Sequence, residues 1–441
     1  MTALGTDQDA RKKFVYDAIS EHMSSRDYKI AADAELYATG KNATIMKYRK
    51  LLYTLTGEAI PDNFSANHKC ASAFLRRFVT QEAAYLLGNG VTFRNDATKK
   101  RFGADFDTLM YKLGKSALVQ KVAFGFFNFD RVQMFKFTEF VPLIDEETGE
   151  LAAGIRFWQL GENKPLRATL YEVEGFTEYQ KVDNEIVVLK ERATYKKHTT
   201  VAKIGKADTT GTNYAKFPIV PLWGCPEKQS TLVGLREQID CYDLIKSGFA
   251  NDVDEASVLY WTITNAGGMD DEDLARFKQK MKTLGVAQLG DEQTAQAHTV
   301  DLPHEAREVY LDRLEKDLYK DAMALDTEQI ASGAVTATQI KAAYEPLNEK
   351  TDEFELCVID FIQGICAVAG IDDEPTFIRS QIVNQSEVTQ MVLSAASELG
   401  TELVLKKLPF LTPEEVEERL KELSAEDLNR FNAKQPITGN E

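Results

Sequence analysis

Residues 234–258, GLREQIDCYDLIKSGFANDVDEASV, hold the pattern that decides the fold. Apolar residues recur there at steps of three or four, which is the spacing of one face of an α-helix. A second run at 304–325, HEAREVYLDRLEKDLYKDAMAL, repeats this spacing. The two runs predict two long helices that bracket the residues between them. The apolar positions of the first run are Leu235, Ile239, Tyr242, Ile245, Phe249, Val253 and Ala256.

The bracketed residues, 259–303, predict a small α/β insert. YWTIT at 260–264 is typical of a strand, and DDEDLARFKQKMKTLG at 270–285 of a helix with acids in its first turn. VAQLG at 286–290 and AHTVDLP at 297–303 are predicted as further strands.

Upstream, the chain changes from helix to strand. Residues 8–53 predict charged, amphipathic helices, whereas 91–225 alternate apolar and polar residues between turn signals. This alternation predicts an antiparallel meander with one solvated face, and GKADTTGTN at 205–213 is expected to be a polar loop. The whole chain is therefore expected to be an α+β protein.

The transition falls at QEAAYLLGNGVTF, residues 81–93, where glycines follow an apolar helix. Phosphate-binding glycines stand before a helix, because the N-terminal end of the helix dipole attracts anions. Gly88 and Gly90 instead predict a helix C-cap and a turn that leads into the sheet.

Downstream, DTEQIASGAV at 326–335 interrupts the helical pattern, with Gly333 as a hinge, and a long helix is predicted over 336–370. Pro346 is expected to kink or interrupt that helix. LTPEEVEERLKEL at 411–423 contains a capping box with Thr412 as N-cap and Glu415 three residues on.

Composition limits the function classes. The formal charge is −17, which opposes tight non-specific binding to nucleic acid but permits DNA to pass without adhering. No signal peptide or membrane span is expected, and the five cysteines form no CxxC pair, so they are expected to be reduced thiols.

The sequence lacks the common catalytic motifs. GKS at 114–116 is no P-loop, because the required glycine position, 109, is a leucine. The histidines show no zinc-ligand spacing, and there is no GxSxG elbow. We therefore expect no catalytic residue, cofactor or metal.

Acidic clusters leave one alternative open. Asp252, Asp254 and Glu255 on one predicted helix, and Asp270–Asp273 on another, could hold Mg²⁺ in a nuclease. A solvated face, or acids placed at a helix N-terminus, is the favoured interpretation.

The order of these parts resembles the portal proteins of tailed bacteriophages of the long-tailed siphophage type. The resemblance covers about residues 60–425 and rests on three collinear blocks rather than on one specific motif. The blocks are PDNFSANHKCASAFLRRFVTQEAAYLLGNGVTF, FPIVPLWGCPEKQSTLVGLREQIDCYDLIKSGFANDVDEAS, and TVDLPHEAREVYLDRLEKDLYKDAMALDTEQIASGAVTATQIKAAYEPLNEKTDEFE.

The resemblance implies a division of the chain. Residues 1–233 would be the wing, 234–258 and 304–325 the stem helices, and 259–303 the clip. Residues 326–335 would be the tunnel loop, 336–370 the kinked helix, and 371–441 the crown and tail.

The resemblance also implies partners: about twelve copies of the chain in a ring, terminase, the major capsid and scaffolding proteins, a head-tail connector and double-stranded DNA, without a membrane. The protein would be located at the capsid portal vertex of the virion, and in the host cytoplasm during assembly. The expected DNA-facing residues of the tunnel loop are Gln329, Ser332, Thr336 and Thr338. An acidic channel face would contain Glu237, Asp240, Asp243, Asp252, Asp254 and Glu255, and the clip would contact terminase through Asp270, Asp271, Asp273 and Lys278.

Two other functions remain as alternatives: a metal-dependent phage DNA nuclease and a minor structural head adaptor. Native mass or negative-stain images of the purified protein would separate them, because only a portal is expected to form the large ring.

Overall fold

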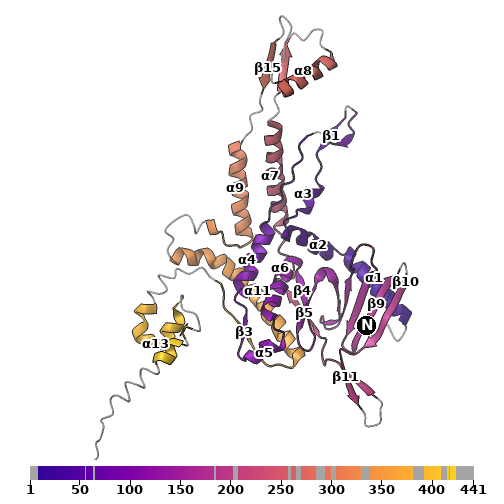
Figure 1. Cartoon of the computed structure of the whole chain (residues 1–441), viewed down its shortest axis with the longest axis vertical. Helices are drawn as coiled ribbons and strands as arrows, with labels where there is room; N and C mark the ends of the chain where they lie inside the picture. Colours follow the sequence, from indigo (N-terminus) through magenta and orange to yellow (C-terminus); the bar gives the residue numbers. More distant parts are fainter. Residues whose placement is uncertain are drawn as a thin grey trace, which may run out of the picture. The chain divides into compact units, whose positions relative to one another are not determined.

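The computed structural model describes residues 8–54, 56–62, 65–182, 185–201, 207–256, 260–264, 270–284, 294–298, 304–328, 337–380, 392–408, 415–416 and 418–423. The chain forms two compact units. The first comprises Met1–Ala324 and Glu349–Ile378, and the second comprises Leu325–Asn348 and Arg379–Glu441. Helices and strands are mixed in the first unit, as expected for an α+β protein (Figure 1).

The helices of the described residues include both predicted long helices of the 234–325 region. They are α1 (Gln8–Ser24), α2 (Arg26–Ala38), α3 (Ala43–Lys47), α4 (Phe74–Leu87), α5 (Asp96–Arg101), α6 (Phe106–Gln120), α7 (Arg236–Ala256), α8 (Asp271–Leu284), α9 (His304–Asp321), α11 (Ala337–Ala369) and α13 (Ala396–Lys407).

The predicted meander is present as a five-stranded antiparallel sheet in the order β10-β9-β8-β7-β6. Its strands are β6 (Phe140–Ile144), β7 (Leu151–Trp158), β8 (Arg167–Glu172), β9 (Gly175–Val182) and β10 (Glu185–Ala193). Buried residues alternate with less buried ones along β9, as the sequence pattern requires. Val15 and Ile19 of α1 pack against Ile155 and Leu170 and cover the sheet's buried face.

A second sheet forms the main core. β13 (Ile219–Trp223), β4 (Val122–Phe127) and β5 (Val132–Lys136) pair antiparallel, with β4 in the centre. Every residue of β4 is buried, because helices cover it; α6 packs against both β4 and β5. A Cβ on Gly125 would lie 2.5 Å from Phe361 Cζ, so only glycine lets α11 approach the strand this closely.

The glycines after α4 make a turn, as predicted. Gly88 is the helix C-cap, and Gly90 has a φ of +79°, which favours glycine. The destination of the turn was predicted wrongly, however. β3 (Val91–Phe93) pairs with β16 (Pro375–Phe377) and joins neither larger sheet, because its partner strand comes from the C-terminal part of the chain.

Three further predictions need correction. Residues 51–53 form a strand, β1 (Leu51–Tyr53), that pairs with β2 (Ala59–Pro61). The polar stretch expected to be a loop contains β12 (Ala207–Thr212), which pairs with β11 (Lys196–Val201). α9 ends at Asp321, before the predicted boundary. Of the two effects predicted for Pro346, an interruption is absent, because α11 runs from Ala337 to Ala369 with the proline inside it; the kink stays a prediction.

The insert between α7 and α9 contains β14 (Tyr260–Thr264), α8 and β15 (Thr294–His298), and β14 pairs with β15 antiparallel. The predicted strand at 286–290 and the capping residue Thr412 lie outside the described residues. All five cysteines are free thiols. Within the described residues, no helix is long and apolar enough to cross a membrane.

Candidate functional site

The long helix α7 has two sides that contact different parts of the chain. Figure 1 shows α9 on one side of α7 and α3 on the other. The α9 side contains Gln238, Tyr242, Phe249 and Asp252, and the opposite side contains Asp240, Asp243, Ser247, Asn251 and Asp254. At 100° per residue the two sets centre roughly 180° apart on the helix. α7 therefore lies between α9 on one side and α3 with its neighbouring residues on the other.

On the α9 side, polar and aromatic contacts join the two helices along their length. Asp252 forms an ion pair with Arg307, and the Phe249 ring meets the His304 ring edge-on at 5.4 Å. Gln238 hydrogen-bonds to Asp321 at the other end of the pair. The apolar residues Ile239 and Leu318 are buried in the main core. The two long helices predicted from the apolar spacing are thus present, and the structure adds that they pack on each other through these polar and aromatic contacts.

On the opposite side, Asn42 binds two of the predicted channel acids. Its Nδ2 donates to Asp240 Oδ1 at 2.9 Å and to Asp243 Oδ2 at 2.8 Å, while its Oδ1 accepts from the backbone N–H groups of Thr44 and Ile45 and caps α3. The backbone N–H of Ser72 donates to Asp243 Oδ1 at 2.9 Å. Asn42 therefore fastens α3 to α7.

Burial changes the acid–base behaviour of this cluster. Burial raises the pKa of Asp243, and the hydrogen bonds from Asn42 and Ser72 offset part of that rise. Tyr37 donates its hydroxyl to Asp240 at 2.5 Å, and burial together with this bond raises the pKa of Tyr37 to about 12. The predicted acidic face is wrong for Asp243, because its side chain is fully buried.

The other predicted channel acids are distributed between the two sides. Asp252 pairs with Arg307, and Asp254 lies 3.3 Å from His68. Glu237 is exposed, and the side chain of Glu255 lies outside the described residues. The six acids do not form one uniform face, because several of them hold the subunit's own parts together.

The acids expected in the clip lie at the start of α8. Asp270 accepts a hydrogen bond from the Asp273 backbone N–H at 2.9 Å, which is the geometry of a helix cap. Asp271 and Lys278 are exposed, and Arg276 lies 4.0 Å from Asp273. Among the described residues, no cluster of His, Cys, Asp or Glu has the arrangement of a metal site.

Of the predicted tunnel-loop residues, Gln329, Ser332 and Thr336 lie outside the described residues. Thr338 lies in the first turn of α11, where it is exposed. It belongs to the second unit.

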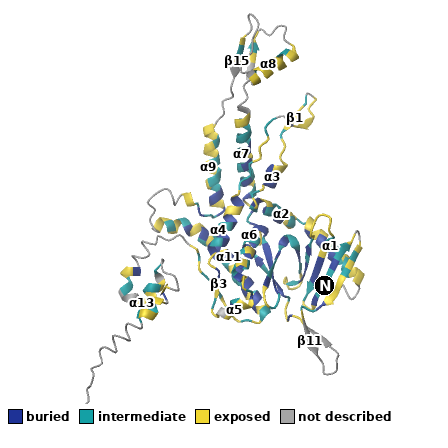
Figure 2. Ribbon diagram, in the orientation of Figure 1, coloured by how far each residue is buried: buried dark blue, intermediate teal, exposed yellow. Residues whose placement is uncertain are grey.

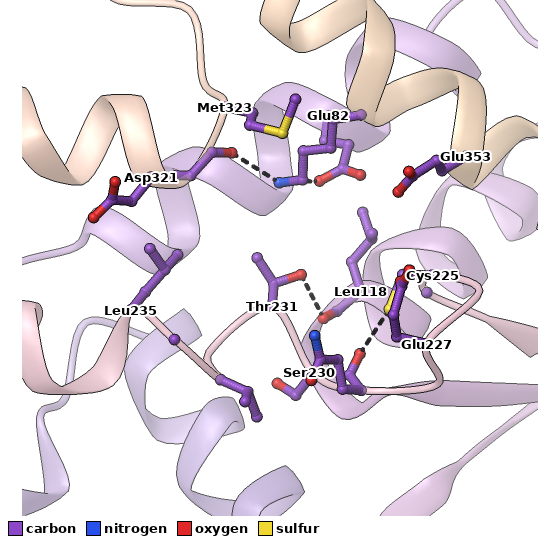
Figure 3. Close-up of a pocket in the computed structure, with 16 residues that line it drawn as sticks. Glu82, Leu118, Cys225, Glu227, Ser230, Thr231, Leu235, Asp321, Met323 and Glu353 are labelled. Carbon is purple, nitrogen blue, oxygen red and sulfur yellow. Dashed lines mark hydrogen bonds and ion pairs between the residues drawn. The ribbon is translucent and has the colours of Figure 1, made fainter.

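A pocket of about 460 Å³ lies at the base of α9, and the sequence did not reveal it (Figure 3). One wall is the loop that follows β13, which is fastened to the end of α6. Ser230 Oγ donates to the Val119 carbonyl at 2.5 Å, and Thr231 Oγ1 to the Leu118 carbonyl at 2.9 Å. The other walls come from α4, from the end of α9 and from α11.

A buried ion pair connects the elements around this pocket. Glu82 of α4 has a side chain that is 2% exposed, and its Oε2 lies 2.7 Å from Lys350 Nζ of α11. The same ammonium donates to the Ala322 carbonyl at 3.2 Å, just past the end of α9. Burial raises the pKa of Glu82, and Lys350 opposes that rise. One lysine therefore links α4, α9 and α11.

One sequence signal could have located Glu82. It stands four residues from Phe78 and four from Leu86, both fully buried, so it lies on the apolar face of α4. An ionisable residue on such a face requires a buried partner. Nothing near Glu82 in the sequence identifies Lys350 as that partner.

Comparison with known proteins gives one family. The family model described as "Phage portal protein, SPP1 Gp6-like" matches residues 20–428. The portal protein of Clostridium phage phiCD119 is 24% identical over 217 residues, which cover 47% of this chain and 48% of that protein. The portal protein of Bacillus phage SPP1 is 22% identical over 412 residues, covering 86% of this chain and 80% of the relative. The chain thus matches about half the length of the first relative and most of the second.

Solved structures with a weaker likeness include the neck of an empty gene transfer agent (GTA) particle computed with C6 symmetry. It has a TM-score of 0.43 and 10% identity, covering 75% of this chain and 88% of that chain. A chain of the virion of a native GTA particle has a TM-score of 0.41 and 10% identity, and the match covers 78% of this chain and 88% of that chain. Because the family model spans nearly all of the sequence, the chain belongs to the SPP1 Gp6-like family of phage portal proteins.

Proposed function

We propose that this portal protein forms a ring of about twelve copies at one capsid vertex, through which DNA enters and leaves. The observation that carries the proposal is the family match over residues 20–428 together with the α7–α9 pair that brackets the α/β insert. In the assembled virion the ring would be the portal vertex, and the subunits would come from the host cytoplasm.

The same proposal assigns a role to each part of the chain. Residues 1–233 form the wing, α7 and α9 the stem, and 259–303 the clip that docks terminase and later the head-tail connector. Residues 326–335 form the tunnel loop, 336–370 the kinked helix and 371–441 the crown. Scaffolding and major capsid proteins surround the ring.

Fewer residues remain candidates for contact with DNA or terminase than the sequence alone implied. Glu237 is exposed and remains a candidate for the channel surface, whereas Asp243 is buried. Exposed acids on a channel wall would repel phosphates and let DNA slide. In the clip, Asp271 and Lys278 are exposed and available to terminase. Gln329, Ser332 and Thr336 remain proposed DNA-facing residues at the tunnel loop, together with Thr338 in the first turn of α11.

We also propose that the chain is not an enzyme. The nuclease alternative depends on acids that the structure uses elsewhere: Asp252 pairs with Arg307, Asp254 lies 3.3 Å from His68, and Asp270 caps α8. Motor ATP hydrolysis would then belong to the terminase. The minor head adaptor remains the second structural alternative.

The test is the mass of the purified chain, measured by native mass spectrometry and negative-stain imaging, alone and after incubation with capsid and scaffolding proteins. A closed ring of about a dozen copies is expected. A chain that stays monomeric in every condition is not a portal. Divalent-metal-dependent cleavage of DNA by the pure chain would favour the nuclease, and a ring of clearly different size the adaptor.

A further inference from the structure

A polar pocket of about 300 Å³ lies along β5 and contains two arginines. Its lining residues are Asp105, residues 131–135 and Arg156 of β7. Arg131 directly precedes β5, which is an edge strand of the three-stranded sheet. Two guanidinium groups from different elements therefore meet at one pocket, and Asp105 is the one carboxylate among its described lining residues.

Arg156 is held in place by aromatic rings. The centre of its guanidinium lies 4.5 Å from the centroid of the Phe135 ring and 5.0 Å from that of the Trp158 ring. Contact with ring faces fixes the plane of a guanidinium and leaves N–H groups at its edge for an acceptor. Among the described residues Arg156 forms no ion pair, and its buried Nε has no hydrogen-bond acceptor. The chain itself therefore leaves this guanidinium without an anion.

Arg131 is oriented by a neighbour on the strand. With the Gln133 amide turned to accept, its Oε1 lies 3.3 Å from Arg131 Nε and 3.2 Å from Arg131 Nη2. Arg131 is exposed and forms no ion pair within the described part of the chain. Its Nη1 has two further N–H groups, which remain for a ligand. Both guanidinium groups are thus positioned before any ligand arrives.

The residues around the pocket are also basic. The Val132 N–H donates to the Phe102 carbonyl at 3.0 Å, which brings the end of α5 to the start of β5. The last turn of α5 contains Lys100 and Arg101, both exposed (Figure 2). Bases therefore outnumber acids here, and the charged residues without an ion pair among the described ones are Lys100, Arg101, Arg131 and Arg156 against Asp105 and Asp130.

Two guanidinium groups at one pocket suit a phosphate better than a carboxylate. A single guanidinium fork satisfies both oxygens of a carboxylate. A phosphate has further oxygens and a charge of up to about −2, so it can engage a second fork. A free or terminal phosphate offers at least three unsubstituted oxygens, whereas a phosphate within a DNA strand offers only two. The arrangement therefore favours a free or terminal phosphate.

We propose that the pocket formed by Arg131, Gln133 and Arg156 binds one free or terminal phosphate group. Arg131 and Arg156 donate to different phosphate oxygens, and Gln133 holds Arg131 in place. Asp105 at the edge of the pocket weakens this binding, because its carboxylate repels the anion. The site does not depend on the proposed ring, so failure of the chain to form a ring leaves it standing.

The test is isothermal titration calorimetry of the full-length chain with inorganic phosphate at low salt, with far-UV circular dichroism to confirm that each variant is folded. The variants are Arg131→Gln, Arg156→Lys and Asp105→Asn. Arg156→Lys keeps the positive charge but loses the fork. The control is Arg76→Gln on α4, which makes the same charge change as Arg131→Gln; Arg76 is exposed and forms no ion pair among the described residues.

We expect wild type to bind one phosphate per chain and the control to match it. Arg131→Gln and Arg156→Lys should each weaken the affinity by at least about tenfold. Asp105→Asn should strengthen it by about two- to threefold. Absence of phosphate binding by the folded wild type, or equal weakening by Arg76→Gln and Arg131→Gln, would overturn the proposal.

Two further titrations separate the sources of the anion: a short duplex DNA without terminal phosphates, and a polyglutamate peptide. Any affinity of wild type for either should be equal in Arg131→Gln and in the control. Duplex binding that Arg156→Lys removes would make a DNA backbone phosphate the ligand and contradict the preference for a free one. Peptide binding that the two arginine variants remove, with no phosphate binding, would make the pocket a carboxylate site.

Discussion

Replacing Lys350 by methionine tests the ion pair at the base of α9. The substitution leaves the Glu82 carboxylate buried without its cation and removes the donor to the Ala322 carbonyl. Removing one partner of a buried ion pair costs about 3–5 kcal/mol. The Lys350 side chain is 20% exposed and borders a pocket of about 460 Å³, so solvent can reach the site. We therefore expect a loss of about 2–3 kcal/mol in the free energy of unfolding, below that range.

The loss should depend on pH in a defined direction. Burial raises the pKa of Glu82 in the folded chain above its ordinary value of 4.5, and removing Lys350 raises it further. The folded variant therefore binds a proton that the unfolded chain releases, and its stability falls as pH rises through the raised pKa. The difference from wild type should be largest at neutral pH and should shrink as pH falls toward 4.5.

Urea unfolding, followed by the fluorescence of Trp158 and Trp223, measures the change. With a slope of about 3 kcal/mol per molar urea, the midpoint should fall by about 0.7–1 M at pH 7. The double variant Glu82→Gln with Lys350→Met removes both charges and should recover most of the loss, because no buried charge is left unpaired. An equal loss in single and double variants, or a loss that does not change with pH, would refute the reasoning.

Three further predictions concern the first unit. Asn42→Asp retains the oxygen that caps α3 but places a third carboxylate beside Asp240 and Asp243. The free energy of unfolding should fall by about 2 kcal/mol at pH 7 and should recover when the pH is lowered. In the control Asn42→Ala, the loss should not depend on pH in this way. Gly154→Ala puts a methyl 2.0 Å from Phe140 Cζ and should lower the stability measured in a thermal melt by about 1–3 kcal/mol. In the control Gly161→Ala, the nearest atom is 3.8 Å from the added carbon, and stability should hardly change. Burial lowers the pKa of His22, so the stability of the wild type should fall as pH falls below 6.5. A His22→Gln variant whose stability falls by the same amount over this pH range would contradict this prediction.

Local patterns predicted much of the fold. α7, α8, α9 and the meander depend on periodicity within single segments, and burial on one side is enough to produce that periodicity. The β1–β2 hairpin was missed because its residues are exposed throughout and show no alternation in burial. β3 was assigned to the wrong sheet because its partner, β16, is distant in the sequence.

The candidate site was less predictable, because charge alone does not indicate a partner. Asp243 and Glu237 look equivalent in the sequence, yet Asp243 is buried by Asn42 and Ser72. Nothing near Asp243 identifies those partners. The tunnel-loop residues Gln329, Ser332 and Thr336 stay predictions.

Met323 has a consequence for how α9 can move. Its φ is +50°, a left-handed conformation that is unusual for methionine. Its N–H donates to the Lys320 carbonyl and that of Ala324 to the Tyr319 carbonyl, both at 3.0 Å. These bonds satisfy carbonyls at the end of α9, so a further turn of helix can form only after both bonds are broken. We therefore expect α9 to keep its length when the residues that follow it move.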